Sequence, residues 1–222
     1  MTKKILVIAP HPDDETLGVG GTIAKHIEKG DKVTILTVSG HLPPLYNEEA
    51  FQETLDEANK AYAILGVTES IFLKIPATCI GEKPVREFNK KINDVVAQVE
   101  PDTVFVPYPD RHIDHRLVFD AALVATRPVY HGANIEIVAA YETLSETHWN
   151  APHIEPNFTP NWVVDITQQI DKKESALRCY SSQIPAFPGA RSIEAMRALA
   201  VFRGTQVGFA YGEGFHIIRK LN

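Results

Sequence analysis

The sequence predicts an α/β protein with a Rossmann-like, mostly parallel sheet in the strand order 3-2-1-4-5 and helices on both faces. Continuous apolar runs such as Ile5–Ala9 suit strands that are buried on both faces. Amphipathic stretches with helical spacing, several ending at a glycine, lie between these runs. No repeat, low-complexity tract or linker divides the 222 residues. We therefore expect a single domain over residues 1–222.

Strands and helices alternate regularly in the first half of the chain. The strands are rich in β-branched residues, and Gly30 and Gly66 stop the first two helices. The expected elements are the strand Ile5–Ala9, the helix Thr16–Lys29, the strand Lys32–Val38, the helix Glu48–Leu65 and a short strand around Ser70–Leu73.

The second half continues the alternation and then becomes more helical. Its expected elements are the helix Val85–Val99, the strand Thr103–Val106, the helix Asp114–Thr126, the strand Ile135–Ala140, the short apolar run Trp162–Val164 and helices near Ile170–Tyr180 and Ser192–Arg203. The stretch Glu142–Asn161 is rich in Thr, Pro and Asn and is expected to be a long surface loop. It is either a lid whose aromatic and imidazole side chains contact a ligand or an irregular connection.

Composition excludes several classes of function. The formal net charge is −6 and no Lys/Arg-rich run occurs, so nucleic acid is not an expected partner. The apolar stretch near the N-terminus is too short for a signal peptide or a membrane span, and we expect no membrane insertion. The two cysteines, Cys79 and Cys179, are expected to be free thiols in a reducing cytoplasm.

A first polar cluster, His11-Pro12-Asp13-Asp14-Glu15, directly follows the first strand. It has a purely structural interpretation, in which Asp14 caps the next helix and Glu15 lies in its first turn. That interpretation explains neither His11 nor two adjacent aspartates, whose charges repel each other unless a cation offsets them.

A second cluster, His112-Ile113-Asp114-His115, follows the strand Thr103–Val106. Taken alone, Asp114 is compatible with a simple helix cap. In an open parallel sheet, however, ligands bind beyond the carboxyl ends of the strands, where the strand order reverses. In the order 3-2-1-4-5 the first and fourth strands flank that point. The two clusters are therefore expected to meet in one crevice.

Together the clusters contain the donors of a catalytic metal site. His11, Asp14 and His115 offer two imidazoles and one carboxylate, which suit Zn²⁺ with a fourth position open to water. Fe²⁺ or another divalent cation remains an alternative. Such an ion makes hydroxide available at neutral pH.

The remaining polar residues have expected catalytic roles. Asp13 is placed to act as the base that activates water, and His112 to stabilise the oxyanion or to protonate the leaving group. Asp114 is expected to orient an imidazole and to hold its tautomer.

These two motifs resemble those of the LmbE/PIG-L family of metal-dependent N-acetylglucosaminyl deacetylases. Further similarities are Leu65-Gly66-Val67, Pro101-Asp102-Thr103-Val104, Lys173 through Ser182-Gln183, Arg203-Gly204 and Tyr211-Gly212-Glu213-Gly214-Phe215. The resemblance implies an LmbE-like fold, the same metal ligands and base, and a homo-oligomer. It also implies removal of the acetyl group from an N-acetyl amino sugar (GlcNAc-type) or its conjugate, with release of acetate and a free amine.

The sequence departs from the family pattern at positions that concern the substrate. Thr54 and Leu55 stand in the region where many members have an arginine, and Pro76–Cys79 stands where many have an aspartate. Asp110-Arg111 replaces glycines, and Tyr180 replaces a histidine. Because these positions affect substrate choice, a metallo-amidase acting on a non-sugar acylated amine remains the alternative.

Other side chains are candidates for substrate contact. These are Arg111, His41 in the loop after the second strand, and Glu213. Arg203 and Glu213 either pair structurally or touch the substrate.

Gly18, Gly20 and Gly21 do not have the G-x-G-x-x-G spacing of a dinucleotide site. Close packing of the helix on the sheet is the better explanation of these glycines.

Overall fold

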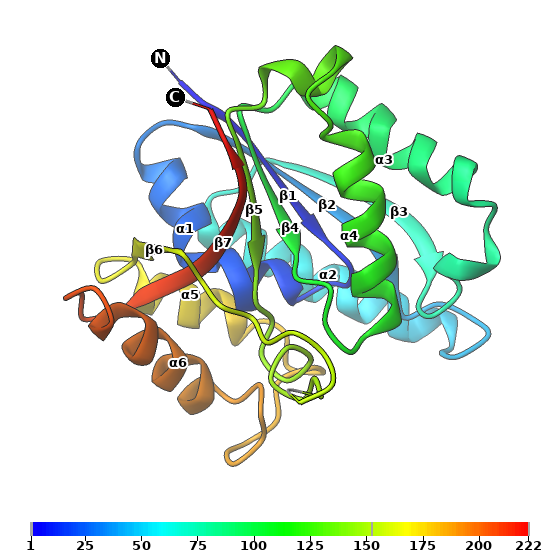
Figure 1. Cartoon of the computed structure of the whole chain (residues 1–222). Helices are drawn as coiled ribbons and strands as arrows, with labels where there is room; N and C mark the ends of the chain where they lie inside the picture. The colour runs from blue at the N-terminus through cyan, green and yellow to red at the C-terminus, as the bar shows by residue number, and fades with distance from the viewer. Residues whose placement is uncertain (1, 152, 222) are drawn as a thin grey trace.

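The computed structural model describes residues 2–151 and 153–221 and contains a seven-stranded sheet in the order β3-β2-β1-β4-β5-β7-β6 (Figure 1). Five strands run parallel in the predicted order 3-2-1-4-5: β1 (Lys4–Ala9), β2 (Lys32–Gly40), β3 (Glu69–Pro76), β4 (Thr103–Pro107) and β5 (Ile137–Tyr141). The other two, β7 (Gly212–Lys220) and β6 (Trp162–Asp165), extend the sheet beyond β5 and are antiparallel to their neighbours.

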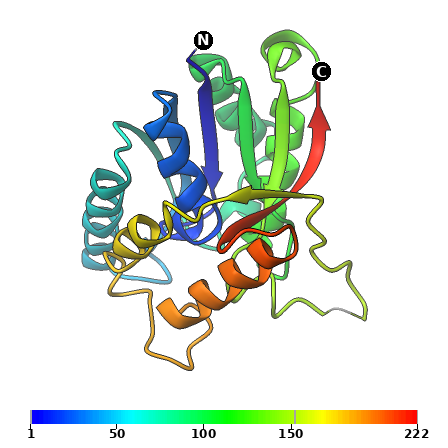
Figure 2. The same cartoon turned by 90° about the vertical axis from the view of Figure 1, so that its left-hand side faces the viewer.

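Helices cover both faces of the sheet, as the sequence predicts. They are α1 (Asp14–Glu28), α2 (Glu48–Leu65), α3 (Val85–Val99), α4 (Ile113–Ala125), α5 (Ile170–Leu177) and α6 (Ile193–Thr205), with short 3-10 helices η1 (Ile80–Glu82) and η2 (Tyr130–Asn134). Figures 1 and 2 show α3 and α4 on one face and α1, α2 and α5 on the other, which creates two hydrophobic cores. Successive residues of β1 point into opposite cores, Ile5 into one and Leu6 into the other.

Local sequence explains where α2 begins and ends. The side chain of Asn47 accepts a hydrogen bond from the backbone N of Ala50 (2.9 Å) and caps the helix. Gly66 follows the last turn with φ of 91°, a left-handed conformation that glycine adopts at little cost. The predicted bounds of this helix, Glu48–Leu65, are confirmed.

Helix α1 lies close to the sheet because its glycines have no side chains. A Cβ atom added to Gly18 would lie 2.2 Å from Cδ2 of Tyr141, and one on Gly21 would lie 2.8 Å from atoms of Ile166. The packing explanation of these glycines is confirmed, and the close approach fixes the start of α1 against the carboxyl ends of the strands.

The structure differs from the predicted elements in three places. Strand β7 was not predicted, because Gly212 and Gly214 interrupt the apolar pattern of its first half. The helix expected over Ile170–Tyr180 ends at Leu177, and a turn follows. The described residues between 142 and 161 form neither helix nor strand, but Glu142–Thr147 is buried rather than on the surface.

Within the described part of the chain, no helix combines the length and apolarity that a membrane-spanning segment requires.

Candidate active site

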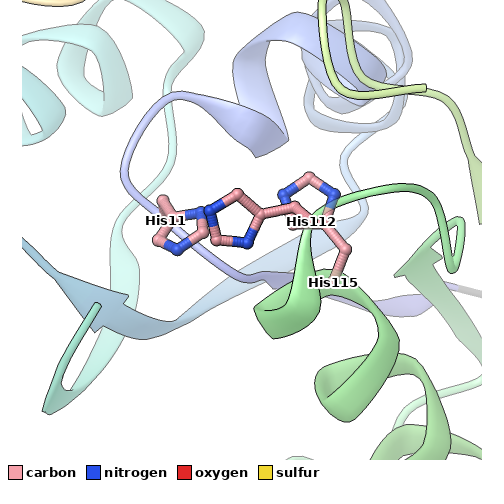
Figure 3. Close-up of side chains that lie close together, drawn as sticks. All are labelled: His11, His112 and His115. Atoms are coloured by element: carbon pink, nitrogen blue, oxygen red, sulfur yellow. The ribbon is translucent and has the colours of Figure 1, made fainter. Parts of the chain in front are cut away.

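The two polar clusters lie side by side at the carboxyl ends of β1 and β4. These strands are direct parallel neighbours, with Ile5 opposite Thr103, so the segments that follow them emerge at the same edge. Figure 3 shows His11, His112 and His115 gathered there, and one ring nitrogen of each lies within 4.8 Å of the others. The expected crevice is therefore present.

The carboxylate of Asp14 lies close to both imidazoles that the sequence predicts to be metal ligands. Its Oδ2 atom lies 3.3 Å from Nδ1 of His11 and 3.3 Å from Nε2 of His115. The same oxygen accepts a hydrogen bond from the backbone N of His11 (2.9 Å). One carboxylate oxygen and two ring nitrogens thus converge on a common point.

Two other aspartates determine how the imidazoles are turned. Nε2 of His11 lies 2.9 Å from Oδ2 of Asp114, and Nδ1 of His115 lies 3.0 Å from Oδ2 of Asp110. A carboxylate accepts, so the imidazole proton of each neutral ring is on the nitrogen that faces it. The opposite nitrogens, which face Asp14, then present lone pairs.

The donor set fits a divalent cation. Nε2 of His115 is buried and lacks a hydrogen-bond partner among the described residues. A buried polar nitrogen without a partner is costly, and a metal ion would remove that cost. Two imidazoles and a carboxylate suit zinc and neighbouring transition metals.

The electrostatics of the cluster agree with this interpretation. Burial disfavours the charged imidazole, but Asp114 and Asp14 raise the pKa of His11 to about 9. Likewise, Asp14 and Asp110 outweigh burial and raise the pKa of His115 to about 10. Burial alone would raise the pKa of Asp14, but the two imidazoles lower it well below its usual value. The local potential therefore favours positive charge at this point.

The capping interpretation of the aspartates is wrong. Helix α1 begins at Asp14 after Asp13, and no side-chain capping bond is found at this end in the described chain. Helix α4 is capped by His112, whose Nδ1 accepts a hydrogen bond from the backbone N of Asp114 (3.1 Å). The proton of neutral His112 is therefore on Nε2. Burial and the charges of its neighbours His11 and His115 lower the pKa of His112, which favours its neutral form.

Asp13 is held in an unusual backbone conformation beside the cluster. Its φ is 117°, a region that non-glycine residues rarely adopt and that occurs mainly at functional sites. Oδ2 of Asp13 lies 3.0 Å from Nη1 of Arg191. Burial and the charge of Asp14 raise the pKa of Asp13 to about 7, although Arg191 opposes the rise.

Sequence reasoning missed Arg191 and the positioning role of Asp110. Arg191 belongs to the irregular segment before α6, where no spacing relates it to the two motifs. Its Nε donates to Oγ of Ser145 (3.0 Å), and its Nη2 lies 3.7 Å from Oε1 of Glu146. Asp110 was noted only as a departure from glycine, although an aspartate five residues before His115 was a signal for an orienting partner.

The candidate substrate residues occupy different places. His41 lines the cavity above the cluster, with its ring 4.3 Å from that of Tyr46. Arg111 is not among the described residues that line this cavity, but its Nη1 donates to Oε2 of Glu146 (3.0 Å), which does line it.

Glu213 is not brought to the cavity. Its carboxylate is buried and accepts hydrogen bonds from the backbone N of Gly21 (2.8 Å), the backbone N of Thr22 (2.7 Å) and Nζ of Lys173 (2.5 Å). Since these partners use its oxygens in the interior, Glu213 has a structural role.

Arg203 forms an ion pair, but not with Glu213. Its Nε and Nη2 each lie 2.7 Å from an oxygen of Glu142, a bidentate arrangement.

The positions that depart from the family pattern fall into two groups: some are buried in the interior, and others line the cavity. Tyr180 is fully buried, and its hydroxyl donates to Glu15 beneath the site. Ala77 and Thr78 line the cavity, and the backbone N of Thr78 donates to Oδ2 of Asp114 (2.8 Å). Thr54 is buried and donates to the backbone of its own helix.

The cavity over the cluster has a volume of about 190 Å³. Its walls come from the segments that follow β1, β2, β3 and β4, together with Glu146, Gln183 and Arg191. All four of those segments leave the carboxyl edge of the parallel sheet, where such folds bind their ligands.

A doubly wound sheet with two histidines and an aspartate at its switch point defines a class of α/β proteins with a candidate metal site at the carboxyl edge of the sheet. Within it, the family model described as PIG-L, GlcNAc-PI de-N-acetylase, matches residues 6–126, and the chain belongs to this family.

Known proteins resemble the chain over most of its length. The diacetylchitobiose deacetylase of Thermococcus kodakarensis is 29% identical, over 97% of this chain and 83% of that protein. The structure of an N,N'-diacetylchitobiose deacetylase from Pyrococcus horikoshii superposes with a TM-score of 0.78 and 28% identity, over 97% of this chain and 84% of that one. GalB, a 4-carboxy-2-hydroxymuconate hydratase from Pseudomonas putida, shares the fold at 22% identity (TM-score 0.79, 100% and 98% coverage). The fold alone therefore does not determine the reaction.

Proposed function

We propose that this chain is a metal-dependent N-deacetylase that hydrolyses the acetamide of an N-acetyl amino sugar or its conjugate. The observation that carries the proposal is the convergence of two oriented imidazoles on Asp14, with the buried carboxyl of Asp13 beside them. The names of the relatives, which are deacetylases of N-acetylated sugars, support the choice of reaction.

His11, Asp14 and His115 would hold the ion, with Asp110 and Asp114 as positioning residues. The donor set suits Zn²⁺, and Fe²⁺ or another divalent cation is the alternative. When bound, the ion would act as a Lewis acid toward the acetyl carbonyl and lower the pKa of water.

Asp13 acts as the general base. It takes a proton from the attacking water as the oxygen–carbon bond forms, and returns it to the amine nitrogen as the carbon–nitrogen bond breaks. A base with a pKa near the working pH is well suited to both transfers. Arg191 holds one oxygen of the carboxylate in place.

His112 stabilises the negative charge that develops on the carbonyl oxygen. Its Nδ1 is occupied by the backbone N of Asp114, so the neutral ring presents Nε2–H as a donor. A fixed donor of this kind stabilises an oxyanion without reorganisation during the reaction.

An acetate-release assay tests the proposal. The metal-reconstituted protein is given N-acetylglucosamine, its glycosides and, as the comparison set, N-acetylated amines without a sugar. We expect acetate from the sugar substrates and loss of activity when a chelator removes the metal. Acetate from the non-sugar amines alone would instead show a metallo-amidase, and full activity of metal-free protein would refute the metal site.

Location and assembly complete the proposal. Cys79 and Cys179 are free thiols, which supports a cytoplasmic protein. The family resemblance supports a homo-oligomer, which light scattering would test.

A further inference from the structure

A second groove adjoins the catalytic cavity. It has a volume of about 430 Å³, and its lining includes Trp149 and the segment 181–185. Gln183 and Arg191 line both this groove and the catalytic cavity. A ligand whose reacting group lies over the histidines therefore has a continuous path into the groove.

The lining of the groove combines an aromatic face with polar groups. Trp149 is 59% exposed although it is large and apolar. Ile184 and Pro185 add apolar surface, while Gln183 supplies an amide. A pyranose ring has apolar C–H faces and hydroxyl groups at its edge, so it matches a surface that offers an indole face beside hydrogen-bonding groups.

The backbone of Trp149 is held by a hydrogen bond, and an arginine lies over its ring. Its backbone N donates to the carbonyl oxygen of Ser145 (2.9 Å), and the guanidinium of Arg111 lies 5.9 Å from the centre of its ring. Arg111 is in turn bound to Glu146, which lines the catalytic cavity. Trp149 is thus linked to the catalytic cavity through Arg111 and Glu146.

The charges favour a neutral occupant. Of the described side chains that line the groove, only Arg191 is charged. Its guanidinium is already paired with Asp13 at 3.0 Å and lies 3.7 Å from Glu146. No cation in this described lining remains for a phosphate or carboxylate.

We propose that this groove binds the second sugar ring of a neutral N-acetylated disaccharide, with that ring stacked on Trp149. The inference rests on the proposed deacetylase function, because it places the acetylated sugar over the histidines. It assigns to Trp149 and Gln183 the choice between a disaccharide and a monosaccharide.

A kinetic comparison tests the groove. The substrates are N-acetylglucosamine, N,N'-diacetylchitobiose and N-acetylglucosamine 1-phosphate. We expect the native enzyme to have its highest kcat/KM on the disaccharide. In Trp149→Ala, the ratio of kcat/KM for the disaccharide to that for the monosaccharide should fall about tenfold, as for a central aromatic contact.

Two aromatic variants serve as controls. Tyr130→Ala removes an exposed aromatic ring (88% exposed, against 59% for Trp149) in η2 that lines neither cavity, and should leave the ratio unchanged. Tyr46→Ala alters a residue that lines the catalytic cavity but not the groove. If Tyr46→Ala and not Trp149→Ala lowers the ratio, or if the 1-phosphate is preferred over the disaccharide, the assignment of the groove is overturned.

Binding without turnover separates this inference from the proposed function. In the metal-loaded Asp13→Asn protein, N,N'-diacetylchitobiose should change the tryptophan fluorescence. Adding Trp149→Phe should remove that change, because the remaining Trp162 is packed against Phe105 and Phe215. If no N-acetyl sugar is hydrolysed but this change is seen, the deacetylase function fails and the groove stands. If hydrolysis occurs with no Trp149-dependent change, the groove is refuted.

Discussion

Replacing Asp110 with asparagine should weaken metal binding although Asp110 is not a ligand. Its buried Oδ2 accepts hydrogen bonds from Nδ1 of His115 (3.0 Å) and Oγ1 of Thr147 (2.9 Å). Its Oδ1 accepts from the backbone N of His112 (3.0 Å). An aspartate satisfies all three donors, whereas an asparagine of the same shape has only one oxygen.

Either orientation of the asparagine amide disrupts the site. With its NH₂ group toward His115, it would require a lone pair on Nδ1 and so move the proton to Nε2, the nitrogen that faces Asp14. With its NH₂ group toward His112, it would meet a backbone donor. Loss of such an orienting partner usually costs 10- to 100-fold in metal affinity, or about 1.4–2.7 kcal/mol.

The affinity is measured by competition with a chromophoric chelator, with melting curves to confirm that both proteins are folded. Thr147→Val is the matched control, because it removes one donor to Oδ2 but leaves the contact with His115 in place. We expect a much smaller loss of affinity in that variant. Native metal affinity in Asp110→Asn would show that the tautomer of His115 is not set by Asp110.

Three other substitutions test separate parts of the structure. Asp13→Asn should lower kcat by about 10²- to 10⁴-fold with stoichiometric metal retained by elemental analysis; near-native kcat would remove Asp13 as the base. Arg203→Ala should lower the free energy of unfolding at pH 7 by about 3 kcal/mol in urea titrations, because Glu142 stays buried without its bidentate partner. Burial raises the pKa of Glu142, but its cationic neighbours outweigh this and hold it below 4.5. Without Arg203 one of those neighbours is lost, so the pKa of Glu142 should be higher in the folded variant than in the native protein. The native advantage should therefore shrink as the pH falls from 7 through the pKa of Glu142 in the variant; an advantage independent of pH would contradict the ion pair. Glu213→Gln should also destabilise the fold, by about 3 kcal/mol, because Lys173 is left buried without a counter-charge. The kcat/KM of this variant should equal that of the native protein. A loss of activity without a loss of stability would show that Glu213 acts in the active site.

The fold was predictable where buried residues recur at a regular spacing along the chain. Helix α2 begins and ends as predicted, because its cap, its amphipathic spacing and Gly66 are local features. Strand β7 was not predicted, since a strand with glycines at alternate positions is recognised only through the partners that pair with it.

The site was predictable where its residues are close together in the chain. His11, Asp14 and His115 occur in two short motifs, and the order of the strands brings those motifs together. Arg191 was not predictable, because its contact with Asp13 joins residues 178 positions apart through an irregular segment. Glu213 was wrongly predicted to contact the substrate. Its motif resembles that of the family, but a motif does not show whether a carboxylate faces the cavity or the interior.

The sequence by itself therefore determined the α/β class, the order of the parallel strands and the two motifs that contain the proposed metal donors. These follow from local patterns of burial and from the rule that parallel strands open their ligand site at one edge. Only the tertiary structure decided which nitrogen of each histidine faces Asp14, which arginine holds Asp13 and where a second groove opens beside Trp149. These features depend on side chains that meet across loops, and no periodic pattern in the sequence records such contacts.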